Sequence, residues 1–215
     1  MIHLVLEDLQ LEDTSKVKFS LYMKIISQIE ALETLKIGRP LIFQTDTLPA
    51  IGCIPKYSEI IYEIKKREKN KPLILMGAQI QQVLDYVDHD ARDDFQKLAE
   101  KFWPGPLTLI IPINKNKILN FMSTDNTLGI RIPDSLTARS LILESGPLAT
   151  SSANISGLNT SFNAESVSND LPNVELLGPL PWEECSGLAS TIITWKKYRK
   201  WKLLRQGQIS LSGIV

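Results

Sequence analysis

The sequence predicts an α/β fold, a single domain in which a twisted mixed β-sheet is flanked by helices. Short apolar runs typical of buried strands interleave with longer segments whose apolar residues recur at helical spacing. The interleaving has no repeated βαβ period, which favours a mixed sheet over a regular parallel one. The length of 215 residues suits one domain, with a helical N-terminal extension over about 1–36 and a core over about 37–210.

Helices are expected wherever apolar residues repeat every three or four positions. The first spans residues 15–35 and is followed by Gly38, because glycine commonly stands just after a helix C-terminus. Ser58 is expected to cap the second helix at its N-terminus. The second and later helices are expected at residues 58–68, 79–87, 90–102 and 135–145.

Strands are expected at the short apolar runs that separate or follow these helices. The polar stretch 161–173 contains no such run and is predicted to be a mobile surface segment. The expected strands cover residues 40–45, 50–54, 72–76, 106–113, 127–133, 146–150, 174–178, 190–195 and 199–205.

Composition argues against several classes of protein. The 24 basic residues balance the 24 acidic ones, whereas non-specific nucleic-acid binders carry a basic excess, so nucleic-acid contacts require a local patch. Two histidines, and two cysteines without a C-x-x-C pair, argue against a histidine triad, a multi-histidine metal site or a zinc finger. Because we find no basic leader and no apolar run of about 18 residues, we expect a cytoplasmic protein without a membrane span.

Positive charge is concentrated at the end of the second expected helix. Cations there stabilise the helix dipole, and the run alone supports that explanation and a phosphate site about equally. An unwinding helix end would place Lys65 and Arg67 on one side, where arginine binds phosphate bidentately and lysine acts as a mobile charge. The run comprises Lys65, Lys66, Arg67, Lys69 and Lys71.

A second polar stretch lies between Gly146 and Gly157. Its side chains are small and carry hydroxyl or amide groups, so they are too polar for a core. Apolar residues alternate with them, which makes the stretch too regular for an ordinary loop. A ligand is therefore expected to approach this backbone and meet Ser151, Ser152, Asn154 and Ser156.

Two further segments carry polar groups at or within strands. Residues 45–47, Thr-Asp-Thr, follow a buried strand and form either a turn or a contact to a polar substrate. Arg131 lies in an otherwise apolar strand, and a buried arginine needs a partner. That partner is either Asp134 or another carboxylate of the chain, or the carboxylate of a ligand.

The C-terminal part of the chain supplies the remaining candidates. Thr108 follows the rigid turn 103–106, and Ser190 lies at the start of an expected strand. Arg205 is followed by Gln206 and Gly207. Between the last two, residues 195–202 mix five cations with three aromatic side chains. Such a mixture is found on RNA-binding surfaces and, more often, on a solvated strand face above apolar residues.

Taken in order, these motifs resemble the YrdC-like family, whose enzymatic members are threonylcarbamoyl-AMP synthases. Any one motif is weak, but the ordered set is specific and runs over about residues 40–207. The matching segments are TDT at 45–47, KKR and KPL within 65–73, WPGPLT at 103–108, IRIPD at 130–134, SAN at 152–154, SG at 156–157, ST at 190–191 and LRQG at 204–207.

The resemblance implies a twisted sheet with a concave basic surface, and a reaction that joins L-threonine, bicarbonate and ATP into threonylcarbamoyl-AMP and pyrophosphate. The product would modify an adenosine beside the anticodon of certain tRNAs, so tRNA or tRNA-modification transferase proteins are implied partners. Mg²⁺ would enter with ATP and bridge its phosphates, because the chain shows no dedicated metal site.

The resemblance, and in particular the family's K-x-R and S-x-N signature, implies roles for individual residues. The implied catalytic residues are Lys65, Arg67, Ser152 and Asn154. The same four are implied to bind ATP, together with Thr108 and Arg205. The implied threonine-binding residues are Thr45, Thr47, Arg131 and Ser190.

One departure from the family pattern concerns the residues after TDT. The family usually continues V-Y-G-L, whereas this chain continues Leu48-Pro49-Ala50-Ile51. Loss of the aromatic hydroxyl leaves two outcomes open, a looser amino-acid subsite or a different substrate. Two alternatives to the synthase therefore stand: a non-catalytic RNA-binding paralogue, and an enzyme that uses another acyl group, as in the carbamoyl-adenylate domains of hydrogenase maturation proteins.

Overall fold

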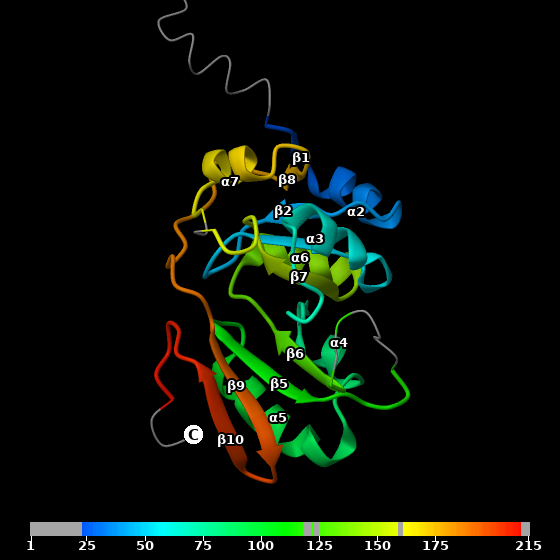
Figure 1. The fold of residues 1–215 in the computed structure, drawn as a ribbon, viewed down its shortest axis with the longest axis vertical. Coiled ribbons are helices and arrows are strands. Elements are labelled where there is room, and N and C mark those ends of the chain that lie inside the picture. Colours follow the sequence, from blue (N-terminus) through cyan, green and yellow to red (C-terminus); the bar gives the residue numbers. More distant parts are fainter. Residues whose placement is uncertain (1–22, 118–121, 123–124, 159–160, 212–215) are drawn as a thin grey trace, which may run out of the picture.

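A computed structural model describes residues 23–117, 122, 125–158 and 161–211. Its strands form one ten-stranded mixed sheet in the order β1-β8-β2-β3-β7-β4-β6-β5-β9-β10, flanked by helices (Figure 1). The predicted α/β fold with a mixed sheet is therefore confirmed. Within the described ranges, no helix has the length and apolar character needed to cross a membrane.

The strands coincide with the apolar runs of the sequence, apart from β1, which was not predicted. In chain order they are β1 Ile25–Ile26, β2 Leu41–Phe43, β3 Ala50–Cys53, β4 Ile74–Met76, β5 Leu107–Pro112, β6 Thr127–Arg131, β7 Leu148–Ser152, β8 Glu175–Leu177, β9 Thr191–Lys197 and β10 Lys200–Arg205.

The α-helices lie between these strands. They are α2 Gln28–Lys36, α3 Glu59–Lys65, α4 Ile80–Leu84, α5 Arg92–Phe102, α6 Leu136–Ser145 and α7 Ala164–Asp170, and short 3-10 turns cover Pro55–Tyr57 and His89–Ala91.

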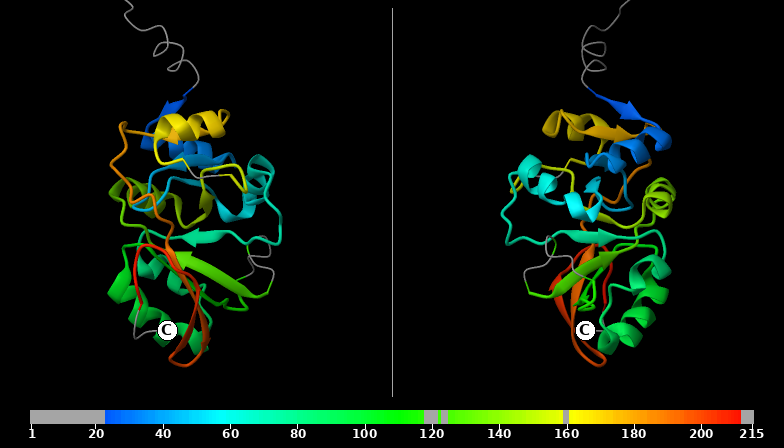
Figure 2. Two further views of the ribbon diagram at one scale, coloured as in Figure 1. Left: turned by 60° about the vertical axis from the view of Figure 1, so that its left-hand side comes forward. Right: turned by 90° about the vertical axis from the view of Figure 1, so that its right-hand side faces the viewer.

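The helices leave part of the sheet uncovered. α4 and α5 lie on one side of β5, β6 and β9 (Figure 2). There the inward residues Leu75, Leu109, Ile130 and Ile193 are fully buried in the larger of two core clusters. The smaller cluster fixes α2 and α6 to the other end of the sheet through Leu35, Phe43 and Leu141. The face of the central strands that turns away from α5 is therefore free to line a site.

Strand register decides which residues share this free face. Side chains alternate between the two faces of a sheet, so residues paired across strands point the same way. Thr150, Ile74, Gly129 and Ile110 form one such row across β7, β4, β6 and β5. A second row, two residues along, contains Met76 opposite Arg131, and Ile192 between Thr108 and Arg205.

The predicted helix over residues 15–35 is only partly confirmed in its described part, because residues 28–35 are helical and the residues before them are not. Residues 25–26 are strand β1, which pairs in parallel with β8, and the helix begins only at Gln28. A capping box sets this start: the Ser27 hydroxyl accepts from the Glu30 backbone, and the Glu30 carboxylate accepts from the Ser27 backbone. Residues 15–22 lie outside the described part of the chain.

Three smaller expectations are wrong or only partly confirmed. The stretch 161–173, predicted to be a mobile surface segment, contains α7, which Asn163 caps and whose Val167 is fully buried. Ser58 does stand at the N-terminus of α3, but its side chain makes no capping hydrogen bond. Its hydroxyl is instead buried without a partner. The expected helix over 79–87 covers only residues 80–84.

Candidate functional site

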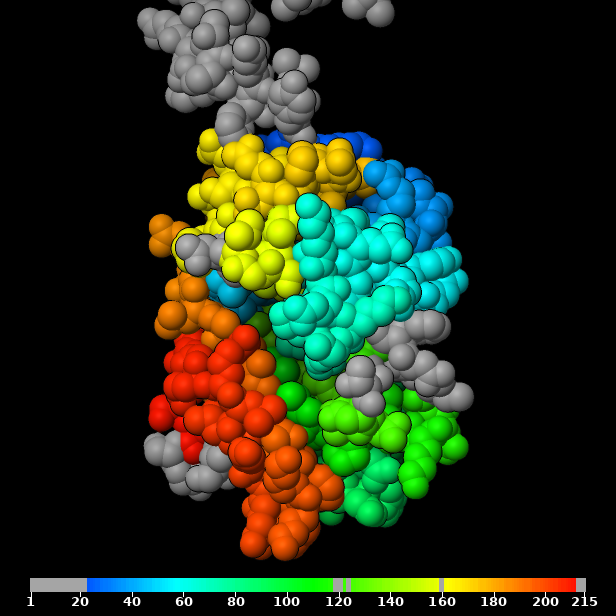
Figure 3. Space-filling model, viewed as in Figure 1, coloured from blue at the N-terminus to red at the C-terminus, as the bar shows by residue number. Residues whose placement is uncertain are grey.

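A cavity of about 510 Å³ lies on the free face of the central strands. Its floor is the two rows described above, and its rim comes from the segments around residues 47–48, 67–73 and 189–190. In the space-filling view the surface is hollowed between the cyan segment after α3 and the orange-red strands β9 and β10 (Figure 3). The cavity thus joins parts of the chain that are distant in sequence.

Seven of the residues predicted to form the site line this cavity. They come from four strands and three loops, and the fold brings them together without any shared local motif. The seven are Thr47, Arg67, Thr108, Arg131, Ser152, Ser190 and Arg205.

Three other predicted site residues, Thr45, Lys65 and Asn154, do not line the cavity but lie directly behind its wall. All three are buried, with exposed fractions of 1 %, 1 % and 6 %. Thr45 is held by Thr47 and the Leu48 carbonyl, to which its hydroxyl donates at 2.7 Å. The structure therefore divides the predicted set into residues that face the cavity and residues that support them.

Lys65 supports the segment 151–154. It is the last residue of α3, and Lys66 after it adopts a left-handed conformation that ends the helix. The Lys65 ammonium donates to the backbone carbonyls of Ser152 and Asn154, each at 2.5 Å. Burial, and secondarily the charge of Arg67, lower the pKa of Lys65 to about 8. Lys65 thus holds the cavity wall through three N–H groups that depend on its protonation.

Asn154 fixes the same segment from the other side. Its amide nitrogen donates to the carbonyls of Ile155 and Leu158, at 2.9 and 2.8 Å. Its amide oxygen accepts from the Ser152 hydroxyl at 2.6 Å. Every polar group of the Asn154 side chain is therefore engaged within the loop, which presents Ser151 and Ser152 to the cavity.

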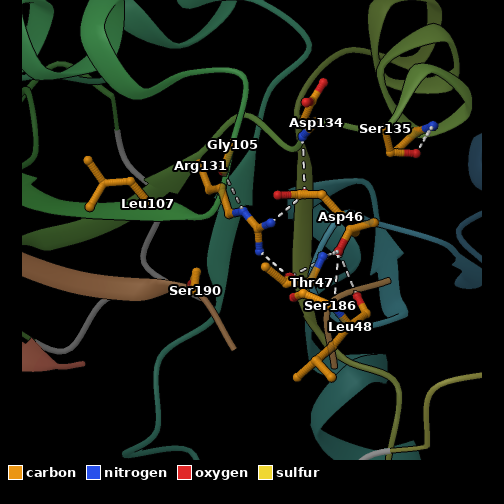
Figure 4. Close-up of polar contacts among 12 residues, drawn as sticks. Asp46, Thr47, Leu48, Gly105, Leu107, Arg131, Asp134, Ser135, Ser186 and Ser190 are labelled. Carbon is orange, nitrogen blue, oxygen red and sulfur yellow. Dashed lines mark hydrogen bonds and ion pairs between the residues drawn. The ribbon is translucent and has the colours of Figure 1, made fainter. Parts of the chain in front are cut away.

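Arg131 lies in the cavity wall beside Asp46 (Figure 4). Its guanidinium is 4 % exposed, and one terminal nitrogen contacts the Asp46 carboxylate at 2.5 Å. Its other nitrogens donate to the Thr47 hydroxyl at 2.7 Å and the Gly105 carbonyl at 3.1 Å. Burial lowers the pKa of Arg131, and the Asp46 carboxylate opposes that shift. The sequence left the partner of Arg131 open, and the structure identifies it as Asp46 rather than Asp134.

Asp46 also connects the cavity to the segment that follows β8. Its carboxylate accepts from the Asp134 backbone at 3.1 Å. Its own carbonyl accepts from the Ser186 backbone at 3.1 Å, and the Thr47 carbonyl accepts from Gly187 at the same distance (Figure 4). Asp46 therefore connects β6, the loop after β2 and the segment that contains Ser186 at the cavity rim.

Arg67 and Arg205 face the cavity without acidic partners. Among the described residues, neither has a carboxylate within 4 Å, and both donate only to neutral oxygens. Arg67 is bound to the carbonyls of Lys71 and Pro72, and Arg205 to Ser190. Burial lowers the pKa of both guanidinium groups. Two partly desolvated cations beside hydroxyl groups are suited to binding an anion.

Two hydroxyl groups, one from β5 and one from the residue just before β9, meet beside Arg205. The Thr108 and Ser190 hydroxyls lie 2.8 Å apart, and both residues are buried in the cavity wall. Arg205 donates to the Ser190 hydroxyl at 3.2 Å. The predicted polar contacts Thr108, Ser190 and Arg205 thus form one connected group.

The apolar part of the cavity floor was not predicted from the sequence. Ile74, Ile110 and Ile192 line the cavity, and Gly129 lies among them. A methyl group on Gly129 would meet Ile74 and Thr108 at ordinary contact distances, so the glycine leaves a shallow, flat area in the floor. Only the pairing of β4, β6, β5 and β9 reveals this surface, because each isoleucine resembles an ordinary core residue in the sequence.

Pro49, the departure from the family pattern, is buried and does not line the cavity. Its carbonyl accepts from the Ala153 backbone at 2.8 Å, and so helps to hold the segment 151–154. The neighbours Leu48 and Ala50 line the cavity instead. Pro49 therefore supports the wall, whereas its neighbours Leu48 and Ala50, which also depart from the family pattern, form part of the surface that a ligand meets.

The described residues offer no group of three or more His, Cys, Asp or Glu side chains that could hold a metal ion. His89 is an exposed residue outside the cavity, and His3 lies in a part of the chain that is not described. Burial raises the pKa of the Cys53 thiol to about 12. This thiol therefore stays protonated and is not a nucleophile at neutral pH.

The chain matches the model of the Sua5/YciO/YrdC family, which is described as "Telomere recombination", over residues 33–207. Similar curated proteins carry the name threonylcarbamoyl-AMP synthase. The protein from Bacillus subtilis is 37 % identical over 151 residues, which are 68 % of this chain and 43 % of that protein. The protein from Pyrococcus abyssi is 32 % identical over 206 residues, which are 88 % of this chain and 59 % of that protein. The chain thus spans about half the length of these two relatives.

Solved structures of proteins from the same family also resemble this chain. The crystal structure of P. abyssi Sua5 complexed with L-threonine has a TM-score of 0.80 and 27 % identity, covering 89 % of this chain and 59 % of that one. The crystal structure of E. coli YciO has a TM-score of 0.74 and 20 % identity, covering 90 % of this chain and 98 % of that one. The second similarity supports the fold alone.

Proposed function

This chain belongs to the Sua5/YciO/YrdC family, and we propose that it forms threonylcarbamoyl-AMP and pyrophosphate from L-threonine, bicarbonate and ATP. The observation that carries the proposal is the pair of partly buried guanidinium groups, Arg67 and Arg205, that face one cavity without acidic partners. A triphosphate would neutralise both. Similar proteins named threonylcarbamoyl-AMP synthase support the identity of the reaction.

The chemistry needs positioning rather than a protein nucleophile. The threonine amine and bicarbonate form an N-carboxylate with loss of water, and a carboxylate oxygen then attacks the α-phosphorus of ATP. The bond from the α-phosphorus to the bridging oxygen breaks, and pyrophosphate leaves with that electron pair. Charge develops on phosphate oxygens, so fixed donors and cations supply the catalysis.

We propose a task for each group of residues from its position in or behind the cavity wall. Arg67 and Arg205 would bind the phosphates, and the Ser152 hydroxyl would contact the nucleotide or the carbamate. The flat area at Gly129 would accept the nucleobase, since planar rings pack on apolar surfaces. Lys65 and Asn154, placed behind the wall, would act by fixing Ser152.

The threonine would lie at the Arg131 side of the cavity. Thr47, Arg131 and Ser190 line that side, and Arg131 keeps N–H groups beyond those that it donates to Asp46, Thr47 and Gly105. Those groups would bind the substrate carboxylate. Thr45 would contribute through Thr47, to which its hydroxyl is hydrogen-bonded at 3.1 Å.

The cofactor and the cellular setting follow from the same proposal. Mg²⁺ would enter with ATP and neutralise phosphate charge. The product would be used to modify tRNA, so transferase proteins that act on tRNA are proposed as partners. A cytoplasmic location is proposed, because these reactants are expected there.

The proposal predicts that pyrophosphate release requires all three substrates. Purified protein with ATP, Mg²⁺ and bicarbonate should release pyrophosphate only when L-threonine is present, and the coupled phosphate assay should show strong threonine dependence. The matched variant is Gly129→Val, which fills the flat area on a backbone that tolerates it, since Gly129 lies in β6 away from positive φ. Its KM for ATP should rise at least tenfold, the scale of losing about 1.4 kcal/mol of binding. Pyrophosphate release that does not depend on threonine, or faster release with another amino acid, would contradict threonine as the substrate.

The lowered pKa of Lys65 predicts a pH dependence. Activity should fall as pH rises through about 8, because the neutral amine loses one of the protons that hold Ser152 and Asn154. The unfolded chain keeps this proton to about 10.5, so between pH 8 and 10.5 the contribution of Lys65 to folding stability rises with pH. Activity should therefore be lost without unfolding, as followed by paired pH profiles of turnover and of urea unfolding. Turnover that stays constant to about pH 9.5 would contradict this.

A further inference from the structure

The hairpin formed by β9 and β10 carries a cationic surface that the proposed reaction does not use. Its five cations are exposed, and none has a carboxylate within 4 Å among the described residues. None of the five lines the cavity. They are Lys196, Lys197, Arg199, Lys200 and Lys202. In a chain of zero net charge, this is a local excess of positive charge at one end of the molecule (Figure 1).

Aromatic side chains accompany this charge. Tyr198, at the hairpin turn, is 60 % exposed, and the Arg199 guanidinium lies over its ring at 4.9 Å from the ring centre. Trp195 and Trp201 are paired across the two strands just behind the turn. Both tryptophans are partly buried against the core, which leaves Tyr198 as the exposed ring among these cations. An exposed aromatic ring between cations suits a ligand that offers both phosphates and flat bases. An anionic membrane or an acidic protein would use the charge but not the stacking surface.

The turn is held in a fixed shape by a buried acid. Asp94 of α5 is 3 % exposed, and its carboxylate accepts from the Arg199 backbone at 2.5 Å and from the Trp195 indole at 2.9 Å. Asp94 thereby holds the backbone while the side chains of Tyr198 and Arg199 stay outside. A surface that is already ordered loses less conformational entropy when it binds a ligand.

The conformation of Arg199 is unusual for its residue type. Its φ is +54°, in the left-handed region where glycine or asparagine is favoured in turns. Glycine would satisfy the backbone here, yet the position carries a guanidinium stacked on a tyrosine. Protection of the free edge of β10 would explain Lys200 and Lys202, but it does not explain an arginine at this position.

We propose that the β9–β10 hairpin is a docking surface for single-stranded RNA, with Lys197, Arg199 and Lys200 contacting phosphates and Tyr198 stacking on a base. Along β10 the hairpin turn is separated from Arg205 by about 17 Å, five residues at about 3.3 Å each. RNA bound at the turn would therefore lie outside the cavity. The surface is independent of the proposed synthase reaction.

The charge contribution is tested with a labelled single-stranded RNA of about 15 nucleotides, a length within the range of such sites. Affinity is measured by fluorescence anisotropy between about 50 and 200 mM salt. Changing Lys197, Arg199 and Lys200 together to alanine should weaken binding roughly tenfold or more and reduce the salt slope by about 2, since each phosphate contact on a single strand contributes about 0.7. The matched control changes Lys36, Lys56 and Lys101, exposed cations outside the hairpin, and should leave binding unchanged.

Stacking and backbone conformation are tested separately. Tyr198→Ala should weaken binding roughly 5- to 100-fold at an unchanged salt slope, while Tyr198→Phe should retain affinity. Arg199→Gly should leave the urea midpoint the same or higher, because glycine suits a φ of +54°, and should still lose RNA affinity. This variant separates loss of the surface from loss of the fold.

Three results would overturn the proposal. The first is a wild-type protein that does not bind the RNA at about 50 mM salt. The second is a control variant that weakens binding as much as the hairpin variant. The third is binding to vesicles of anionic phospholipid that is as tight as binding to RNA, together with unchanged RNA affinity in Tyr198→Ala. That result would mean that the hairpin binds any anionic surface by charge alone. Pyrophosphate release should be unchanged in every hairpin variant, so failure here leaves the proposed reaction untouched.

Discussion

Changing Lys65 to methionine should lower threonine-dependent pyrophosphate release roughly 10²-fold, the scale for a small misplacement of groups that position the substrate. The Lys65 side chain is buried to 1 % exposure, so methionine can fill its space while removing the charge. The carbonyls of Ser152 and Asn154 would lose their donor, and the wall segment 151–154 would lose its tether to α3. Steady-state kinetics with each substrate varied in turn measures the effect.

The same variant should also be less stable. A buried carbonyl left without a donor costs about 1–3 kcal/mol, so urea unfolding should shift by that amount. Lys69→Ala is the control: Lys69 is an exposed neighbour whose recorded partner is Glu59, and it should change neither property. Asn154→Ala removes the hydrogen bond to the Ser152 hydroxyl and should lower turnover in the same direction. Near-wild-type turnover in Lys65→Met would exclude a role for this residue in the reaction.

The positions of the strands could be predicted from the sequence because buried strands are short apolar runs. Residues 50–54 and 106–113, for example, were expected as strands and contain β3 and β5. Their order in the sheet could not be predicted. β7 lies between β3 and β4 and pairs antiparallel with both, which depends on crossovers that leave no local signal.

The errors at the N-terminus and in 161–173 have local causes. In residues 15–35 apolar residues keep helical spacing on both sides of the Ser27–Glu30 capping box, so spacing alone does not show that the helix begins after Ser27. In 161–173 the polar composition concealed Asn163, a good N-cap, and the buried side chains of Ala164 and Val167, which attach α7 to the core. A short helix with one buried face carries little hydrophobic signal.

The candidate site could be predicted in its chemistry but not in its geometry. The resemblance selected Arg67, Arg131 and Ser152, and all three line one cavity. It did not reveal that Lys65 lies behind the wall, because helix α3 ends at this residue and turns its ammonium toward the carbonyls of another segment. The pairing of Arg131 with Asp46 was equally hidden, since the two residues are 85 positions apart.

Changing Arg131 to methionine should destabilise the protein by about 3–5 kcal/mol, because it leaves the Asp46 carboxylate buried without its ionic partner. The second carboxylate oxygen of Asp46 already lacks a hydrogen bond, so little else can compensate. Turnover should fall by at least about tenfold, with the main effect on the KM for threonine, since this guanidinium lies where the substrate carboxylate is proposed to bind. Urea unfolding and threonine titrations measure the two effects independently.

The double variant Arg131→Met with Asp46→Asn separates the structural contribution of Arg131 from its role at the substrate. Removing both charges eliminates the unpaired carboxylate, so the double variant should recover most of the lost stability, as expected for coupled neighbours. Threonine-dependent turnover should not recover, because the cation that faces the cavity is still missing. If activity returned together with stability, Arg131 would serve only to neutralise Asp46, and the threonine carboxylate would have to bind another cation, of which Arg205 is the one that shares this cavity wall with Ser190.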